Sequence, residues 1–366
     1  MAKLTLLLAG GFLGSGKTTA IEQAARQLLK NGRKVGVITN DQGVQQVDTH
    51  FIKGQLIPSG EVANGCFCCQ YNELEKNIAS LALLQQTEII FAESVGTCTD
   101  LAATVVNPLL SFNPDRYDIV LSIFADVRVL VKFLEDGRSA FHDTVSYIYE
   151  RQLQEADIIV VTKIDLLSEG QLADARRLIG SAYREKRVLF QNSLSEDDIG
   201  RWLAACAGVD NPHLRASLEI DYDRYGAGEA ELAWLDEEIG IVTADDGAGR
   251  AAQQFCKKLY NELSTKGYPI GHLKFLIDDG KTRQKLSFTS MPGGHEHPAS
   301  SGMETDRIVV LINARVQTRP EVLQAIVNEV ILETEREASC KITEYQLSAF
   351  RPGFPRPTHR ILSIAK

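Results

Sequence analysis

The stretch that decides the fold is GFLGSGKT, from Gly11 to Thr18. It fits the pattern G-x-x-x-x-G-K-[ST], in which a glycine-rich loop joins a strand to a helix and surrounds phosphates with backbone N–H groups. The flanks have the required character, because the apolar run LTLLLA precedes the loop and apolar residues recur at helical spacing after Thr18. The stretch therefore predicts a nucleoside-triphosphate site.

Two side chains of this loop have specific expected tasks. Lys17 is expected to reach the β- and γ-phosphates, and the Thr18 hydroxyl is expected to ligate Mg²⁺. The loop predicts a triphosphate but neither the base nor the reaction, since kinases, ATPases and GTPases share it. The loop residues predicted to bind the nucleotide are Gly11, Gly14, Ser15, Gly16, Lys17, Thr18 and Thr19.

Strand and helix patterns alternate over the first two hundred residues. Helical stretches lie between most of the apolar runs, and the first helix is expected to end at Asn31-Gly32. This alternation predicts an α/β fold, namely a P-loop NTPase with a mostly parallel sheet covered on both faces. The predicted strands are residues 4–9, 33–39, 88–93, 117–126, 157–162 and 188–193.

The second half of the chain has a different rhythm. A polar stretch at 209–229 is expected to link a nucleotide-binding domain, 1–208, to a smaller α+β domain, 230–366. The order of patterns in that domain is βαββ-βα-β, which suggests a sandwich of ferredoxin-like kind. In its strand GHLKFLID, His272 and Lys274 share one face, which is either an ordinary half-exposed surface or a polar side left for a partner.

Composition and charge exclude some classes of protein. The chain has 366 residues, a formal net charge of -9 and 44% apolar residues. A net negative charge argues against a broad nucleic-acid footprint, which needs a basic surface. No run reaches the roughly 18 apolar residues of a membrane span, and the N-terminal apolar run reads as a buried strand rather than a signal peptide. We expect a cytoplasmic protein whose thiols stay reduced.

The segment TKID, from Thr162 to Asp165, ends the fifth predicted strand and resembles the guanine-reading NKxD element of GTPases. A carboxylate at Asp165 can accept two hydrogen bonds from the N1–H and N2–H₂ groups of guanine, an edge that adenine lacks. The Lys163 stem is expected to pack on the base. Thr162 stands where the element usually has Asn, which loses one amide contact.

Acidic residues at strand ends are candidates for the γ-phosphate end of the site. In EIIFAESVG, Glu93 ends a strand and Gly96 follows three residues later, as in the ExxG form of the Walker B and switch II element. Glu93 could act on the Mg²⁺ shell or orient the attacking water, and the Gly96 N–H could approach the γ-phosphate. Asp48 is a candidate Mg²⁺ group in the switch I region, with Asp41 as its competitor. The predicted catalytic set is Lys17, Glu93 and Asp48.

Three of the seven cysteines fall within four positions, in the stretch NGCFCC. Zn²⁺ takes thiolates in tetrahedral geometry, so Cys66, Cys68 and Cys69 predict a metal site whose fourth position is a carboxylate, a water or a partner's ligand. A redox pair fits less well, because such close cysteines close strained rings. The isolated Cys206, Cys256 and Cys340 are expected in the core, and Cys98 is set apart from them because it follows ESVG.

Taken in order, GGFLGSGKTT, ITNDQGVQQVD, NGCFCC, ESVG and TKID resemble the CobW-type GTPases, which are relatives of the UreG and HypB metallocentre-assembly GTPases. The resemblance covers roughly residues 4–207, and the GCxCC loop is the hallmark of that family. It implies a GTPase that uses GTP and Mg²⁺, binds Zn²⁺ or another transition metal such as Co²⁺, and delivers it to a client metalloprotein. It also implies a smaller C-terminal domain.

The chain departs from the usual family pattern in three places. NDQG stands where the family usually has an NE[FY]G-like segment, and TKID stands where it usually has NKxD. Many members carry a histidine-rich tract, of which only His295-Glu-His297 remains, and this segment is expected to be a solvated loop. A cobalamin or corrinoid context stays open for this subgroup, as does a homodimer.

The interpretation favoured by these motifs is a GTP-hydrolysing metallochaperone with a client metalloprotein as partner. One alternative is a P-loop ATP-using transferase with an incidental zinc loop, against which TKID argues. Another is a nucleotide-gated activator of a corrinoid protein that carries no metal itself, against which CFCC argues.

Overall fold

The computed structural model describes residues 3–40, 57–63, 65–137, 141–209, 214–291 and 303–363. These residues form two compact units, which are described separately. The first contains the described residues up to Gly228 together with residues 354–363, and the second contains those from Glu229 to Gly353. No helix within these ranges is long and apolar enough to cross a membrane.

The first unit is built on a seven-stranded sheet in which every pairing is parallel. Its order is β3-β2-β4-β1-β5-β6-β7. The predicted α/β fold is therefore confirmed, with one strand more than expected. The bounds are β1 (Leu4–Gly10), β2 (Val35–Asn40), β3 (Ser59–Val62), β4 (Ile89–Glu93), β5 (Tyr117–Asp126), β6 (Ile158–Thr162) and β7 (Arg187–Gln191).

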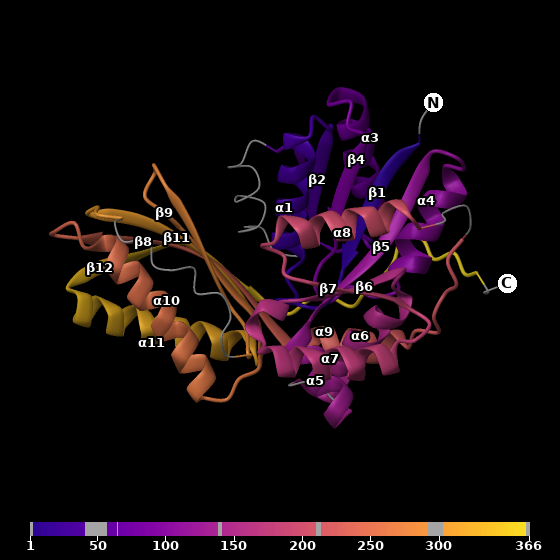
Figure 1. Cartoon of the computed structure of the whole chain (residues 1–366). Helices are drawn as coiled ribbons and strands as arrows, with labels where there is room; N and C mark the ends of the chain where they lie inside the picture. The colour runs from indigo at the N-terminus through magenta and orange to yellow at the C-terminus, as the bar shows by residue number, and fades with distance from the viewer. Residues whose placement is uncertain are drawn as a thin grey trace. The chain divides into compact units, whose positions relative to one another are not determined.

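Helices cover both faces of this sheet (Figure 1). One face carries α1 and α8, whose apolar side chains form a single buried cluster with those of five strands. In addition, α3 contacts β2, and both α6 and the π-helical turn η1 contact β5. The bounds are α1 (Lys17–Lys30), α3 (Tyr71–Leu84), η1 (Ala102–Val106), α4 (Asn107–Phe112), α5 (Val127–Asp136), α6 (Asp143–Glu155), η2 (Ile164–Leu166), α7 (Glu169–Ala182), α8 (Glu196–Ala207) and α9 (Tyr222–Ala230).

Trp202 on α8 fixes that helix to the sheet. Its ring centroid lies 5.8 Å from that of Phe91 and 5.1 Å from that of Phe124, and its indole N–H donates to Ser122 Oγ at 3.0 Å. A fully buried tryptophan contributes a large apolar area and needs a partner for its N–H, and both conditions are met here. This packing holds β4 and β5 in place, and these strands lead into the site described below.

The second unit is an antiparallel five-stranded sheet in the order β10-β9-β11-β8-β12, with α10 and α11 packed against it in one apolar core. Without β10, the order β9-β11-β8-β12 is that of a ferredoxin-like sandwich. The prediction for this half is therefore confirmed, and β10 extends the sheet through a hairpin. The bounds are β8 (Leu232–Thr243), α10 (Ala248–Thr265), β9 (Ile270–Asp278), β10 (Arg283–Phe288), β11 (Arg307–Gln317), α11 (Pro320–Ala338) and β12 (Cys340–Phe350).

The polar face of β9 is not the open surface that one reading of the sequence allowed. His272 is only 6% exposed, and its register partner Arg315 on β11 is completely buried. The Arg315 guanidinium lies 4.0 Å from the centre of the Trp234 ring and donates to Asp236 at 2.7 Å. This face therefore holds a buried polar cluster, because the charges on neighbouring strands pair with one another.

The observed division of the chain differs from the expected domain boundaries at two segments. The expected linker contains α9, and Arg215 within it pairs with Asp157 at 2.8 Å, inside the first unit. The C-terminal residues also return to the first unit, where the buried Asn107 side chain donates to the carbonyl oxygens of Arg215 and Ile361 at 2.9 and 3.0 Å. Hydrogen bonds and an ion pair between distant segments assign both of these segments to the first unit. Local composition does not reveal such contacts.

Candidate functional site

The phosphate loop joins β1 to α1, and its backbone has the left-handed turns that glycine permits. Gly11, Gly14 and Gly16 have φ values of 122°, 72° and 90°. At Gly11 the reason is also steric, since a Cβ atom would lie 2.2 Å from the carbonyl oxygen of Phe124. The loop therefore passes directly against β5, which only a residue without a side chain allows.

Lys17 and Thr18 open α1 and point their polar atoms into the loop region. The Lys17 ammonium donates to the carbonyl oxygens of Gly11 at 2.7 Å and Phe12 at 3.2 Å. The Thr18 hydroxyl donates to Glu93 Oε1 at 2.8 Å. These three polar side chains are nearly buried, so the predicted phosphate and magnesium residues lie together at the carboxyl ends of β1 and β4.

Gly96 is brought against the same loop. A Cβ atom on Gly96 would lie 2.6 Å from the Leu13 side chain and 3.0 Å from the Leu13 backbone nitrogen. Its carbonyl oxygen accepts a hydrogen bond at 3.0 Å from Gln152, on α6. The segment that follows β4 therefore packs directly on the phosphate loop. A displacement of one of these segments must displace the other.

The TKID segment also contacts the phosphate loop. The Thr162 hydroxyl donates to the Ser15 carbonyl at 2.6 Å, and the Lys163 ammonium donates to the Gly14 carbonyl at 2.7 Å. Thr162, which departs from the usual Asn, thus ties the loop to β6. Asp165 lies in the 3₁₀ turn η2 and is exposed.

Asp126, at the end of β5, is a residue of this site that the sequence reading missed. Its carboxylate lies 2.9 Å from the Lys163 ammonium and 2.6 Å from the Arg128 guanidinium. Burial alone would raise the pKa of Asp126, but the hydrogen bond from Arg128 and the charge of Lys163 lower it below its ordinary value. An acidic residue at the end of the strand YDIVLSIFAD was the available signal.

Three other candidates lie outside the described residues. Asp48 and its competitor Asp41 fall between residues 41 and 56, and His295-Glu-His297 falls between 292 and 302.

The three clustered thiols do come together. Cys66 Sγ lies 2.8 Å from Cys68 Sγ and 3.3 Å from Cys69 Sγ, and the remaining pair is 3.8 Å apart. The loop curls because the N–H groups of Cys69 and Gln70 donate to the Cys66 carbonyl at 3.0 and 2.9 Å. These three cysteines form a group suited to a metal ion.

The neighbouring thiols shift one another's protonation. Hydrogen bonds from Cys68 and then Cys69 lower the pKa of Cys66 well below its ordinary value. The same contact with Cys66 raises the pKa of Cys68 well above its usual range and raises that of Cys69 to about 11. Among the three thiols, the thiolate form is therefore favoured at Cys66. A divalent cation would complete this set, since thiolates are its ligands and metal binding releases the remaining protons.

Asn40 anchors the start of the thiol loop. Its amide nitrogen donates to the carbonyl oxygens of Val62 at 2.9 Å and Gly65 at 2.6 Å, and its Oδ1 accepts from the Phe67 N–H at 2.9 Å. Asn40 is the first residue of the NDQG segment. The sequence alone assigns this residue no role.

The C-terminal segment lies against the other side of the thiol loop. The backbone N–H of Thr358 donates to the Cys68 carbonyl at 2.8 Å, and the Thr358 hydroxyl donates to the Cys69 carbonyl at 2.9 Å. The backbone N–H of Arg356 lies 3.3 Å from Cys69 Sγ. Figure 1 shows this segment, in yellow, returning along the first unit. The geometry of the thiol loop thus depends on residues nearly three hundred positions away.

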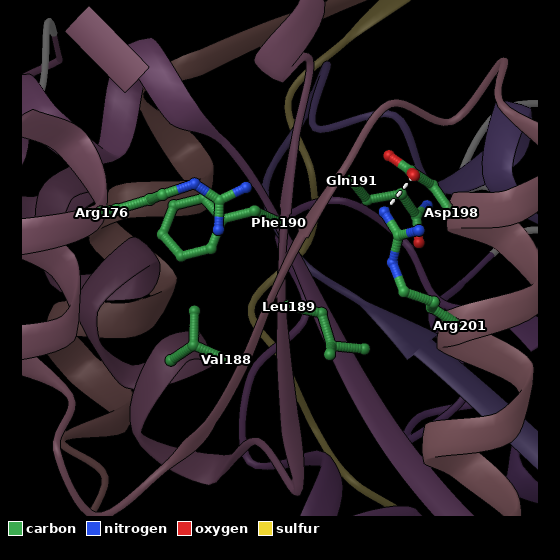
Figure 2. Close-up of a pocket in the computed structure, with 7 residues that line it drawn as sticks. All are labelled: Arg176, Val188, Leu189, Phe190, Gln191, Asp198 and Arg201. Carbon is green, nitrogen blue, oxygen red and sulfur yellow. Dashed lines mark hydrogen bonds and ion pairs between the residues drawn. The ribbon is translucent and has the colours of Figure 1, made fainter. Parts of the chain in front are cut away.

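A separate hollow lies beside β7, at one edge of the sheet (Figure 2). The Arg176 guanidinium lies 4.5 Å from the centre of the Phe190 ring, and Arg201 pairs with Asp198. Its lining includes none of the residues predicted to bind nucleotide or metal. We therefore give this hollow no part in the candidate site.

Comparison with known proteins gives four further findings. A family model described as "CobW/HypB/UreG, nucleotide-binding domain" matches residues 5–190. The zinc chaperone YjiA of Escherichia coli K12 is 30% identical over 181 residues, 47% of this chain and 52% of that protein. The zinc chaperone CobW of a Sinorhizobium species is 25% identical over 289 residues, 67% of this chain and 79% of that protein.

The match to YjiA thus spans about half the length of that relative. Among solved structures, HypB of Helicobacter pylori in complex with nickel is 15% identical with a TM-score of 0.41, and the match covers 59% of this chain and 92% of that one.

Proposed function

The chain belongs to the CobW/HypB/UreG family, and on that premise we propose that it is a GTP-hydrolysing metallochaperone that carries zinc on Cys66, Cys68 and Cys69. The observation that carries the proposal is the meeting of three thiols within 3.8 Å of one another in a chain with a complete phosphate loop. Two relatives are named zinc chaperones, which supports zinc as the cargo and a client metalloprotein as its recipient.

At the phosphate end, Lys17 and the amides of the loop hold the β- and γ-phosphates. Thr18 and Glu93 would hold Mg²⁺, which neutralises phosphate charge when bound, and Asp48 is proposed as a further ligand from outside the described residues. Gly96 offers its N–H toward the γ-phosphate. Support comes from the hydrogen bond of 2.8 Å between Thr18 and Glu93, which places a hydroxyl and a carboxylate side by side.

These roles are tested by GTP hydrolysis in the presence of Mg²⁺. Lys17→Ala should abolish turnover, because the ammonium that pairs with the phosphates is lost. Glu93→Gln should retain nucleotide binding and lose turnover. The control is Lys30→Ala at the other end of α1, whose exposed side chain should leave turnover unchanged. Absence of GTP hydrolysis by the unmodified protein, with zinc and without it, would refute the hydrolase assignment.

At the base end, Asp165 reads guanine and the Lys163 stem packs on the ring. Support comes from the exposed position of Asp165 in the turn after β6, and from the Lys163 ammonium, which is held by Asp126 and the Gly14 carbonyl. Asp165→Asn should shift preference from guanine toward xanthine nucleotides, because the hydrogen-bond demand at that edge reverses. Equal affinity of the unmodified protein for ATP and GTP would refute guanine recognition.

The nucleotide and the metal are proposed to be coupled. The thiol loop is anchored by Asn40 at the end of β2, and the chain that follows the loop leads to β4 and Glu93. We expect the GTP state to hold zinc more tightly and hydrolysis to loosen it, by analogy with ordered switch loops. Typical coupling energies are about 1–3 kcal/mol, or roughly 5–150-fold in affinity, and zinc must raise GTP affinity by the same factor.

A chelator-competition titration of Zn²⁺ tests this coupling. It compares GDP with a non-hydrolysable GTP analogue, and it is repeated with Cys66→Ser. Identical zinc affinity in both nucleotide states would leave the thiols as a structural site and remove the chaperone mechanism. A difference that persists in Cys66→Ser would place the metal elsewhere.

A further inference from the structure

The C-terminal segment, residues 354–363, contacts two functional parts of the first unit at once. At Thr358 it binds the thiol loop, through the two hydrogen bonds described above. Two positions further on, the Arg360 guanidinium donates to Asp100 Oδ2 at 2.7 Å. Asp100 belongs to the segment that follows β4. One short stretch of chain therefore touches both the metal-binding thiols and the segment that leads from the nucleotide site.

The contact between Asp100 and Arg360 is a largely buried ion pair. The Asp100 side chain is 1% exposed, and its Oδ2 also accepts from the Tyr222 hydroxyl at 2.8 Å. The Arg360 guanidinium lies 5.4 Å from the centre of the Tyr222 ring. No hydrogen bond to Asp100 Oδ1 exists among the described residues. The Arg360 charge thus compensates a buried carboxylate, and its removal would leave an unpaired charge in the interior.

The other end of the segment that follows β4 reaches the nucleotide site. Four residues before Asp100, Gly96 packs against Leu13 of the phosphate loop. Gln152 on α6 is completely buried, and its side-chain nitrogen donates to the carbonyl oxygens of Gly96 at 3.0 Å and Cys98 at 2.8 Å. The segment that follows β4 is thus held between the phosphate loop and the C-terminal segment.

The turn that follows Asp100 is also bound to the C-terminal segment. The Ile361 N–H donates to the Ala103 carbonyl at 2.8 Å, inside the π-helical turn η1. Turns of this kind are rare and occur frequently at functional sites. A shift of the segment that follows β4 therefore acts on the C-terminal segment in two ways, through the ion pair of Arg360 and through the backbone hydrogen bond of Ile361.

We propose that the ion pair of Asp100 and Arg360 links the nucleotide site to the metal site, so that the C-terminal segment closes on the thiol loop in the GTP state and loosens after hydrolysis. This inference rests on the proposed metallochaperone function and names the residues that carry its coupling. With GTP bound, the segment that follows β4 is ordered at the γ-phosphate, and Arg360 holds the C-terminal segment on the thiols. Once the phosphate leaves, that hold weakens and zinc binding loosens. Both residues are positioning residues, since they act on the thiol loop through the backbone at Thr358.

The test compares the zinc affinity of the full-length protein with GDP and with a non-hydrolysable GTP analogue, by chelator competition. In the unmodified protein the ratio of the two affinities should lie in the roughly 5–150-fold range of typical couplings. Arg360→Gln should bring this ratio close to one, and Arg360→Lys, which keeps the charge, should retain part of it. Asp100→Asn should also lose the ratio, and Asn tolerates the left-handed backbone at this position. The double variant should lose no more than either single variant, because the two residues act as one pair.

The matched control is Arg215→Gln, which removes another ion pair of the first unit, between Arg215 and Asp157 at 2.8 Å. Both of these side chains are 15% exposed, and the Arg215 guanidinium also donates to the Ile119 carbonyl at 2.9 Å. This variant should lower the melting temperature and keep the affinity ratio. A merely structural role of Arg360 would give Arg360→Gln the same result.

The outcomes separate this inference from the function on which it rests. An unchanged affinity ratio in Arg360→Gln overturns the link and leaves the metallochaperone and its coupling standing. A ratio of one in the unmodified protein refutes the proposed coupling and the link together. If the variants do not fold, amide hydrogen exchange of the unmodified, zinc-loaded protein decides. Residues 356–361 should exchange faster with GDP than with the GTP analogue, and equal exchange in the two states overturns the link.

Discussion

The N–H group of Arg356 should contribute to zinc affinity although its side chain does not. This N–H lies 3.3 Å from Cys69 Sγ, while the Arg356 side chain is exposed. Arg356→Pro removes the donor and Arg356→Ala keeps it. Because Pro357 follows, residue 356 is already restricted to extended backbone, which a proline at 356 also tolerates.

The expected size of the effect follows from the charge on the acceptor. A hydrogen bond to a charged group contributes about 1.5–3 kcal/mol, and the sulfur is a thiolate when it ligates zinc. At about 1.4 kcal/mol for each factor of ten, Arg356→Pro should weaken zinc binding by roughly 10–150-fold. Thr358→Val, which removes the neutral hydrogen bond to the Cys69 carbonyl, loses about 0.5–1.5 kcal/mol and should weaken binding by roughly 2–12-fold.

The assay is competition for Zn²⁺ against a chromophoric chelator, with GTP hydrolysis and thermal unfolding measured on the same samples. Arg356→Ala should match the unmodified protein in all three. Equal zinc affinity of Arg356→Pro and Arg356→Ala, at equal thermal stability, would refute the reasoning, because the two variants differ at this site mainly in the N–H group.

Three further predictions concern other parts of the chain. Burial, with a smaller contribution from a neighbouring glutamate, raises the pKa of Glu237 to about 8, and neither of its oxygens has a hydrogen-bond partner among the described residues. Because the folded-state pKa is raised, the free energy of unfolding falls as pH rises from about 4.5 to about 8. In denaturant unfolding, the stability of Glu237→Gln relative to the unmodified protein should therefore increase by about 2–3 kcal/mol between pH 5 and 7, at about 1.4 kcal/mol per pH unit. A pH-independent difference would contradict this. Gly11→Ala should abolish nucleotide binding and lower the melting temperature, because the new Cβ would lie 2.2 Å from the Phe124 carbonyl oxygen. The control is Gly32→Ala, whose Cβ would have nothing within 4 Å. It should keep nucleotide binding and lose only about 1 kcal/mol of stability to left-handed backbone strain. Asp126→Asn should weaken binding of a fluorescent GTP analogue, since it removes the carboxylate that pairs with Arg128 and Lys163. Unchanged binding would show that those cations are held without it.

Much of the fold could be predicted because its signals are local. The six predicted strands of the first half are all present, and the first helix ends at Lys30 with Asn31 as its C-cap, at the expected Asn31-Gly32 stop. The strand that was missed, β3, has only four residues, SGEV, with no apolar alternation to reveal it. It forms because it pairs in parallel with the edge of β2. The pairing is a property of the sheet rather than of the segment itself.

The site residues likewise divide into those that a local motif predicts and those that only the fold brings to the site. Those of the phosphate loop, Glu93, Gly96 and TKID stand in a fixed relation to strand ends, and parallel strands bring their carboxyl ends to one edge. Asn40 and Asp126 also end strands, but neither belongs to a motif whose spacing announces a role. They contact the thiol loop and Lys163 through side-chain hydrogen bonds and ion pairs that depend on the final packing.

By itself the sequence determined the parallel α/β sheet, the phosphate loop and the thiol cluster, because strand period, glycine turns and closely spaced cysteines act over a few residues. Only the tertiary structure decided that the C-terminal segment closes on that cluster through Arg356 and Thr358. These contacts join segments that no local pattern relates. They form because strand order sets which loops meet, and because buried donors and acceptors then take the partners within reach.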